Sequence, residues 1–168
     1  MIALRPAAPG DLELYRNLLN ILHRESAPFT RELDGVDARG YFDYSAAEPY
    51  FSGEEGVMPF IIELDGRTAG LAAVTRAPYA KPGCDFCLQE LMVLPRFRGQ
   101  GVATQACRLL ARAHPGRWCL IALTGNVRAV KFCQDMIASL GRLECCGRLD
   151  DESAYFEFTV APGEDAPR

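Results

Sequence analysis

Two arginines and two glycines follow an apolar stretch in the middle of the chain, and this combination is suited to binding an anion. Leu91–Leu94 has no polar residue, as expected for a strand buried on both faces, and Pro95 ends it because proline has no N–H for a sheet. A helical pattern begins after Arg96, Arg98, Gly99 and Gly101. The start of a helix offers unpaired N–H groups and a partial positive charge, and glycine lets the backbone approach a bound group closely. We therefore predict a cradle for a phosphate or pyrophosphate at this turn. An ordinary glycine-containing loop with solvated arginines is the alternative.

Two other phosphate-binding motifs fit this stretch poorly. A dinucleotide-binding fingerprint needs a third glycine three residues after Gly101, where Thr104 stands. A P-loop needs Gly-Lys followed by Ser or Thr, and the stretch contains no such sequence. Nucleotide-binding enzymes of these two classes are therefore disfavoured.

The elements that would position this turn alternate between strands and helices. Periodicity predicts strands over residues 2–4, 58–64, 67–75, 84–94, 118–123, 142–149 and 153–160. It predicts helices that open at Pro9-Gly10-Asp11, that run over residues 99–114, and that extend from Asn126, as N-cap, to Gly141. Asp65-Gly66 is a strong hairpin-turn signal. The alternation of apolar and polar residues over 153–160 predicts a half-buried strand. The second helix would bury one face, formed by Val102, Ala106, Leu109, Leu110 and Ala113, and leave Arg108 and Arg112 solvated.

Residues 24–56 show no clear period. One or two short helices with loops are expected there. The segment holds many aromatic side chains: Phe29, Tyr41, Phe42, Tyr44, Tyr50 and Phe51. These aromatics either cap the core or wall a substrate cleft, since irregular segments often carry specificity.

Length and charge limit the classes of protein that need considering. The 168 residues suit one domain with a full core, and the net charge of −4 argues against a general nucleic-acid or acidic-membrane binder. No apolar run reaches the length of a membrane span, and the N-terminus lacks the pattern of a signal peptide. We therefore expect a cytoplasmic protein that contacts neither nucleic acid nor membrane.

The seven cysteines are expected to be reduced in that compartment. Cys84-x-x-Cys87 and Cys145-Cys146 could supply metal ligands. Adjacent residues of a strand point to opposite faces, however, and this disfavours a closed zinc site. A redox role for the C-x-x-C pair is disfavoured further, and small buried thiols are the expectation.

The chain resembles the GCN5-related N-acetyltransferase (GNAT) family. Arg98-Gly99-Gln100-Gly101-Val102-Ala103 matches the hallmark Arg/Gln-x-x-Gly-x-Gly/Ala of that family, and the expected order β-α-(α)-β-β-β-α-β-α-β-β is the order of its members. The resemblance covers residues 2–160 and is specific over about residues 90–133. It implies an α/β fold with a mixed, mostly antiparallel sheet, a splayed parallel pair and helices on both faces. The amino-acid sequences of several segments are similar to those of a bacterial branch of uncharacterised predicted acetyltransferases. Residues 1–160 would form a single domain, and the charged, Pro/Gly-rich residues 161–168 a flexible tail.

The resemblance implies a binding site for acetyl-CoA as co-substrate. The backbone of the Arg98–Ala103 motif would bind the pyrophosphate, with charge added by Arg98. The strand end at Met92–Leu94 would pair with the pantetheine arm beside a bulge that splays the strands, and Asn126 matches an asparagine near that arm. The N–H of Val93 could also polarise the thioester carbonyl. The full set of expected binding residues is Met92, Val93, Leu94, Arg98, Gly99, Gln100, Gly101, Val102, Ala103, Thr104 and Asn126.

Acetyl transfer to an amine needs a group that removes a proton from the acceptor, and Glu90 is the candidate base. It lies three residues before Val93, at a charged position in an otherwise apolar strand. Desolvation there would raise its pKa toward the working range, and a water could relay the proton if Glu90 is distant. A solvated glutamate, or one paired with an arginine, is the alternative interpretation.

The candidate acid departs from the family pattern. Many members have a tyrosine seven residues after the asparagine, and this chain has Cys133 there. A thiol could protonate the departing thiolate of coenzyme A because the two pKa values are similar. Cys133 also falls on an apolar helix face, where it would only pack. Coenzyme A would then leave as the thiolate, or take a proton from water or Tyr155.

We therefore expect an N-acetyltransferase that uses acetyl-CoA and no metal, and that transfers the acetyl group directly to a primary amine of a small molecule, peptide or protein. A monomer or homodimer is expected. Nothing in the sequence chooses the acceptor, the acyl chain or the oligomeric state. A non-catalytic acyl-CoA-binding or sensor domain is the alternative, and a scaffold protein with a vestigial cradle is a second.

Overall fold

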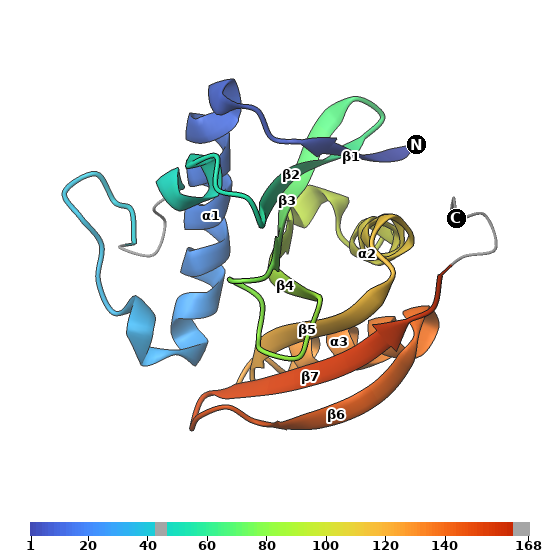
Figure 1. The fold of residues 1–168 in the computed structure, drawn as a ribbon. Coiled ribbons are helices and arrows are strands. Elements are labelled where there is room, and N and C mark those ends of the chain that lie inside the picture. The colour runs from blue at the N-terminus through green and yellow to red at the C-terminus, as the bar shows by residue number, and fades with distance from the viewer. Residues whose placement is uncertain (43–46, 163–168) are drawn as a thin grey trace.

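The computed structural model describes residues 1–42 and 47–162 (Figure 1). Its strands are β1 (Ile2–Pro6), β2 (Val57–Leu64), β3 (Arg67–Arg76), β4 (Phe86–Val93), β5 (Gly116–Leu123), β6 (Arg142–Arg148) and β7 (Ser153–Val160). Its α-helices are α1 (Leu12–Ser26), α2 (Val102–Ala113) and α3 (Val127–Leu140). The predicted order of strands and helices is confirmed. Tyr44 and residues 163–168 of the expected tail lie outside the described residues.

The segment between α1 and β2 forms short 3₁₀ helices where one or two short helices were expected. The described ones are η2 (Ala27–Phe29), η3 (Arg31–Leu33) and η5 (Glu48–Phe51). Two further 3₁₀ turns, η1 (Pro9–Asp11) and η6 (Pro95–Phe97), precede α1 and follow β4.

The described residues form a seven-stranded sheet in the order β1-β2-β3-β4-β5-β7-β6. Every neighbouring pair is antiparallel except β4 and β5, which are parallel. This is the mixed, mostly antiparallel sheet that the sequence predicted. The predicted hairpin turn is also confirmed, since Asp65 (φ 51°) and Gly66 (φ 73°) both have the positive φ that a tight turn between twisted strands requires.

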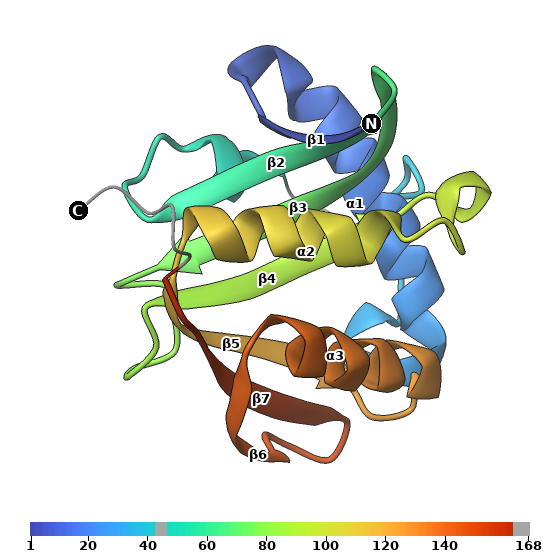
Figure 2. The ribbon, with the colours of Figure 1, turned by 90° about the vertical axis from the view of Figure 1, so that its right-hand side faces the viewer.

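Helices cover both faces of the sheet. One face is covered by α1, and its core includes Tyr15, Leu19, Ile61, Leu71 and Met92. The opposite face is covered by α2 and α3, which lie side by side in front of the sheet in Figure 2. The larger core lies on this second face, between these helices and strands β2–β5 and β7. Side chains of β4 therefore alternate between two separate cores.

The pattern of α2 predicted most of its buried face, although Leu109 is only partly buried. Val102, Ala106 and Leu110 are buried, and Arg108 and Arg112 are exposed as expected. Ala113 is exposed instead of buried. It is the last residue of the helix and borders an open apolar groove between α2 and β1.

The prediction of a half-buried last strand is wrong at Glu157. Its side chain points away from the larger core but is only 5% exposed. The connection between β3 and β4 folds over this face and places Lys81 in an ion pair with Glu157, while Arg117 forms a second ion pair with it at 2.6 Å. A loop that returns over its own sheet leaves no signal in the periodicity of the covered strand.

The seven cysteines differ in burial. Cys84, Cys87, Cys107 and Cys119 are buried, Cys133 is partly buried, and Cys145 and Cys146 are exposed. The last two contradict the expectation of buried thiols, because β6 is the edge strand and nearly all of it is exposed. In the described ranges, no cluster of His, Cys, Asp and Glu is arranged to hold a metal ion. No helix within residues 1–42 and 47–162 has the length and apolar character needed to cross a membrane.

Candidate active site

Strands β4 and β5 separate in the middle of the sheet. They pair at Phe86↔Trp118, Cys87↔Cys119 and Leu88↔Leu120, and the pairing ends there although both strands continue. The register between β3 and β4 shifts at the same level, because Val74 is opposite Leu88 and Ala73 is opposite Glu90. Gln89 is therefore an extra residue, a β-bulge that bends β4 away from β5. We call the region beyond Leu88 and Leu120 the split.

The backbone of Val93 faces the split. The N–H of the next residue, Leu94, donates to the carbonyl oxygen of Ala69 at 2.8 Å, so Leu94 turns its polar backbone groups toward β3. Those groups alternate in direction along an antiparallel ladder, so Met92 also faces β3 and Val93 faces away from it. Of the three residues expected to pair with a pantetheine arm, only Val93 is oriented to do so.

The carbonyl oxygen of Val93 already has a partner. Arg98 donates to it through Nε at 2.7 Å and to Glu25 Oε2 through Nη2 at 2.6 Å. Arg98 therefore joins the end of β4 to the last turn of α1, a positioning role that the sequence did not predict. The N–H of Val93 remains as the donor directed into the split.

The turn from β4 into α2 has the backbone of an anion cradle. Gly99 (φ 73°) and Gly101 (φ 75°) are both left-handed, and no atom lies within 4 Å of a Cβ placed on either. Gly101 is the N-cap of α2, and the first hydrogen bond of the helix runs from the Gln105 N–H to its carbonyl oxygen at 3.0 Å. The N–H groups of the first turn, in Val102, Ala103 and Thr104, have no acceptor within the helix. The Gln100 side chain folds back to donate to the Arg96 carbonyl oxygen at 3.0 Å, so it stabilises the turn.

Asn126 begins α3 at the far end of β5. Its side-chain oxygen accepts from the Ala129 N–H at 3.1 Å, so it is the predicted N-cap. Its own N–H donates to the carbonyl oxygen of Leu123, the last residue of β5. Next to it, the ring of Phe29 lies 3.3 Å from the Cβ that a side chain at Gly125 would have. Asn126 thus fixes the turn between β5 and α3. At this end of the split the turn lies next to Phe29, which follows α1.

Glu90 lies on the α1 side of the sheet, next to the split. It is half-buried, and the hydroxyl of Tyr50 donates to its Oε1 at 3.0 Å. Burial raises the pKa of Glu90 to about 7, against the opposing effect of the hydrogen bond from Tyr50. No arginine among the described residues pairs with it. The carboxyl is therefore only partly accessible to solvent and has no arginine partner among the described residues, and its pKa lies where a general base is most effective.

Tyr50 is a site residue that the sequence did not single out. Its ring lies 5.4 Å from the ring of the buried Tyr15. Burial raises the pKa of Tyr50, so the hydroxyl stays protonated and acts as a donor to Glu90. The two partners lie 40 positions apart in the chain, and Tyr50 has no distinguishing neighbour in the sequence. No local signal could have paired them.

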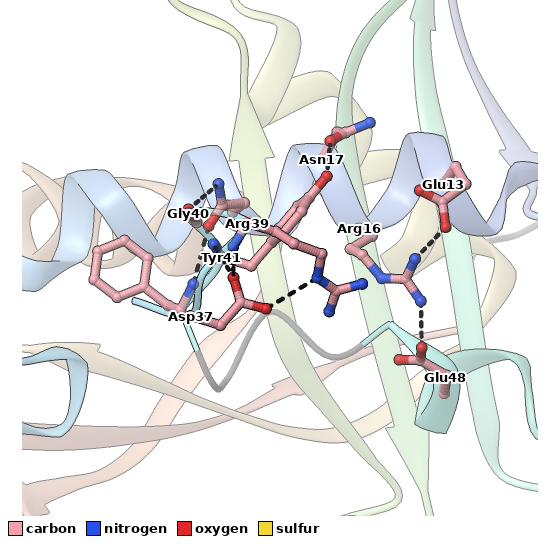
Figure 3. A network of polar contacts seen from close by, with 10 residues as sticks. Glu13, Arg16, Asn17, Asp37, Arg39, Gly40, Tyr41 and Glu48 are labelled. Atoms are coloured by element: carbon pink, nitrogen blue, oxygen red, sulfur yellow. Dashed lines mark hydrogen bonds and ion pairs between the residues drawn. The ribbon is translucent and has the colours of Figure 1, made fainter. Parts of the chain in front are cut away.

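Ion pairs along α1 hold the segment that carries Tyr50 (Figure 3). Arg16 bonds both Glu13, one turn earlier, and Glu48 at the start of η5. Further along α1, Asn17 accepts from the hydroxyl of Tyr41 at 2.7 Å. η5 is thus fixed against α1 from outside, while Tyr50 points from it to Glu90.

Cys133 lies on the opposite face of the sheet from Glu90. It is partly buried and packs against the core beneath α2 and α3. Burial raises the pKa of Cys133 to about 11, which makes the thiol a weaker acid than an exposed one. The other proposed proton donor, Tyr155, lies on the α1 side opposite Ile121 of β5, with its hydroxyl 3.7 Å from the sulfur of Cys145. The geometry favours packing as the role of Cys133.

Among the described strands, β4 and β5 form the one parallel pair, and a bulge in β4 opens it. A glycine cradle follows at the start of the next helix. Together these features define an N-acetyltransferase fold. A family model described as Acetyltransferase (GNAT) family matches residues 17–136, and the chain belongs to this family. The predicted fold class, family and enzyme class are confirmed. No curated protein matches the sequence.

Solved structures share this fold at low sequence identity. An acetyltransferase from Thermus thermophilus superposes with a TM-score of 0.67 at 17% identity, over 95% of this chain and 97% of that one. A domain from Methanocaldococcus jannaschii has a TM-score of 0.68 at 12% identity, over 95% and 99%. The aminoglycoside acetyltransferase AAC(6')-Ib, in complex with coenzyme A and kanamycin, has a TM-score of 0.66 at 16% identity, over 95% of each chain.

Proposed function

We propose that the protein transfers the acetyl group of acetyl-CoA directly to a primary amine. The observation that carries this proposal is the split between β4 and β5, which has the cradle of α2 at one end and the half-buried carboxyl of Glu90 at its edge. A thioester acyl donor in the split would have its anionic end at the cradle. Its acyl group would then lie within reach of both faces of β4.

The residues of the cradle fit a pyrophosphate. The first turn of α2 offers N–H groups that have no acceptor within the helix, and the surroundings of a Cβ placed on Gly99 or Gly101 are open. Arg96 is exposed beside them. The guanidinium of Arg98 already donates to Glu25 and to the carbonyl oxygen of Val93, so it can add positive charge to the cradle only while it keeps these bonds. We therefore assign Arg98 mainly a role in stabilising the turn.

Bound acetyl-CoA would supply an activated acyl group, and the chain would supply proton transfer and orientation. The N–H of Val93 donates to the carbonyl oxygen of the acyl group and stabilises the charge that develops there. The carboxylate of Glu90, directly or through a water, takes a proton from the ammonium group of the acceptor. Tyr50 holds Glu90 in place by its hydrogen bond of 3.0 Å. Water or Tyr155 protonates the leaving thiolate, and Cys133 packs.

The acceptor would be an amine of a small molecule, peptide or protein. AAC(6')-Ib in complex with coenzyme A and kanamycin shows that a chain of this fold can hold an amine-bearing small molecule. A structure described as histone acetyltransferase HPA2 and related acetyltransferase, from Corynebacterium glutamicum, supports a protein amine equally. A cytoplasmic location and a monomeric or homodimeric state remain predictions from the sequence.

Ligand-induced stabilisation tests the donor site. Acetyl-CoA at about 100 times its Kd should stabilise the protein by about 2.7 kcal/mol, which raises Tm by roughly 5–10 °C for a chain of this size. NAD should give no shift. A panel of amines with acetyl-CoA should then release free coenzyme A thiol, measured by a thiol reagent. A shift without turnover on any amine would favour the acyl-CoA sensor, and no shift would refute the donor site.

A further inference from the structure

Three cysteines gather on the α1 side of the sheet, at the closed end of the split. Cys87 of β4 and Cys119 of β5 are directly opposite each other in the parallel pair, and Cys84 precedes β4 in the loop. The three pack together with Ala80, and Cys87, Cys119 and Cys84 are 5%, 1% and 9% exposed. Residues in register on neighbouring strands point to the same face, so the sulfurs of Cys87 and Cys119 are neighbours. None of the three takes part in the proposed acetyl transfer.

The spacing of the two strands suits a covalent bond between these thiols. Neighbouring strands lie about 4.8 Å apart, within the range of about 4.4–6.8 Å between the Cα atoms of disulfide-bonded residues. The residues next in register, Leu88 and Leu120, form the last pair before the split. A bond between Cys87 and Cys119 would therefore need little backbone movement.

The surroundings place negative charge on the sulfur of Cys119. A hydrogen bond from the Cys87 thiol lowers the pKa of Cys119 to about 7, and the N–H and ammonium group of Lys81 act in the same direction against the effect of burial. Hydrogen bonding to Cys119, together with burial, raises the pKa of Cys87. The ammonium group is held over this face by its ion pair with Glu157. The surroundings therefore favour the thiolate form at Cys119 and the protonated thiol form at its neighbours Cys87 and Cys84.

Other charged groups face the cluster. Glu157 raises the pKa of Cys84 and Arg117 lowers it, although burial has the largest effect, and the pKa of Cys84 rises to about 11. Glu90 adds a smaller upward effect on the pKa of Cys87. Cys84 is the most exposed of the three thiols, so the loop that carries it is the side from which a small oxidant can enter.

We propose that Cys87 and Cys119 form a redox-active dithiol, which hydrogen peroxide converts to a disulfide. The thiolate of Cys119 attacks one oxygen of the peroxide, the O–O bond breaks, hydroxide leaves, and Cys119 becomes a sulfenic acid. The sulfur of Cys87 then attacks the Cys119 sulfur, an S–S bond forms as the S–O bond breaks, and the thiol proton leaves with the hydroxyl group as water. In total two thiols lose two electrons and two protons, and the peroxide becomes two waters.

The bond would lie one residue before the point where β4 and β5 separate. It would join the two strands covalently at the base of the split. The chemistry rests on the cluster alone and holds whether or not the protein transfers acetyl groups. A dithiol reductant would reverse it.

Disulfide mapping tests this site. The protein is first changed at Cys145→Ser and Cys146→Ser, since these exposed thiols would otherwise react with peroxide. After peroxide treatment and alkylation of free thiols, the protein is digested with trypsin and with a protease that cleaves before aspartate. Cleavage before Asp85 and after Arg96 and Arg117 places Cys84, Cys87 and Cys119 on three separate peptides. Mass spectrometry should find the Cys87 and Cys119 peptides linked with the loss of two hydrogens, and dithiothreitol should release them. A bond from Cys84 to Cys119, or no linked peptide, would overturn the proposal.

Two further variants and one control variant, all in the Cys145→Ser and Cys146→Ser background, test the roles of Cys87 and Lys81. Cys107→Ala removes a buried thiol outside the cluster and should leave the disulfide yield unchanged, whereas Cys87→Ala should abolish it and leave Cys119 to oxidise further. Lys81→Met should lower the initial rate at pH 7 about two- to fivefold, because less of Cys119 is then ionised. An unchanged rate in Lys81→Met, with the fold retained by its melting temperature, would contradict the assigned thiolate.

Discussion

The hydrogen bond from Tyr50 to Glu90 makes the proposed general base testable through its pH profile. The pKa of Glu90 is about 7, so the rate of acetyl transfer should rise through this pH and fall roughly tenfold per unit well below it. Tyr50→Phe keeps the ring against Tyr15 and removes only the hydroxyl. Because that hydroxyl favours the ionised carboxylate, its loss should raise the pKa of Glu90.

The size of this shift follows from the bond that is lost. A hydrogen bond to a charged group contributes about 1.5–3 kcal/mol, and one pKa unit corresponds to about 1.4 kcal/mol. Water can partly replace the hydroxyl at a half-buried carboxyl, so we expect a shift of about one unit. The ionised fraction of Glu90 at pH 7 would fall from about one half to about one tenth, and kcat about fivefold. Near pH 9 the two enzymes should have nearly equal rates.

The assay measures kcat over pH 5.5–9.5 at saturating acetyl-CoA with one amine, for the wild type, Tyr50→Phe and Tyr41→Phe. Tyr41 is the matched control, because it lies with Tyr50 between α1 and β2 and its hydroxyl donates to Asn17 of α1 instead of Glu90. Protonation of the acceptor amine affects all three proteins equally. An unchanged midpoint in Tyr50→Phe, or a loss of rate that is equal at every pH, would refute the role of Glu90 as the base.

Three further predictions concern two glycines and Cys133. Gly101→Val should remove the rise of Tm with acetyl-CoA, because Gly101 has φ +75° at the N-cap of α2 and valine rarely adopts that conformation. Gly66→Val is the control: Gly66 has φ +73° and equally open surroundings, so the variant should cost about the same 1–2 kcal/mol of stability but keep the rise. Loss of the rise in both variants would contradict the cradle. Gly70→Ala should destabilise the fold by more than about 3 kcal/mol in guanidinium unfolding, because the new Cβ would lie 1.9 Å from the carbonyl oxygen of Met92. A variant as stable as the wild type would show that β3 and β4 do not lie this close together at Gly70. Cys133→Ala should keep kcat within about twofold and lower stability by about 1 kcal/mol, and a hundredfold drop in kcat at constant KM would instead identify the thiol as the acid.

Local signals in the sequence predicted the turns and the helix cap that depend on neighbouring residues. The turn at Asp65-Gly66, the N-cap at Asn126 and the glycine turn at Gly99 and Gly101 each follow from backbone preferences within a few residues. Such features need no knowledge of the rest of the chain. The mixed, mostly antiparallel character of the sheet was predictable because the order of elements resembles that of a known family.

Contacts between distant segments could not be predicted in the same way. Tyr50 meets Glu90, and Lys81 covers Glu157, only because irregular segments fold back over the sheet. The register that places Cys87 opposite Cys119 is set by a parallel pair whose strands are separated by a whole helix. The exposure of Cys145 follows from the edge position of β6, which its own residues do not reveal.

The bulge at Gln89 is what gives β4 two chemical faces. Leu88 packs in the core beneath α2 and α3, and in a regular strand Glu90, two residues later, would point into the same apolar core. The extra residue reverses the alternation, so Glu90 and Met92 face α1 while Leu91 and Leu88 share the other core. The same residue ends the pairing with β5 and leaves the edge of β4 open. One inserted residue therefore both opens the split and moves the carboxylate to the side where Tyr50 can hold it, which is why the proposed donor and base sites stand on a single strand.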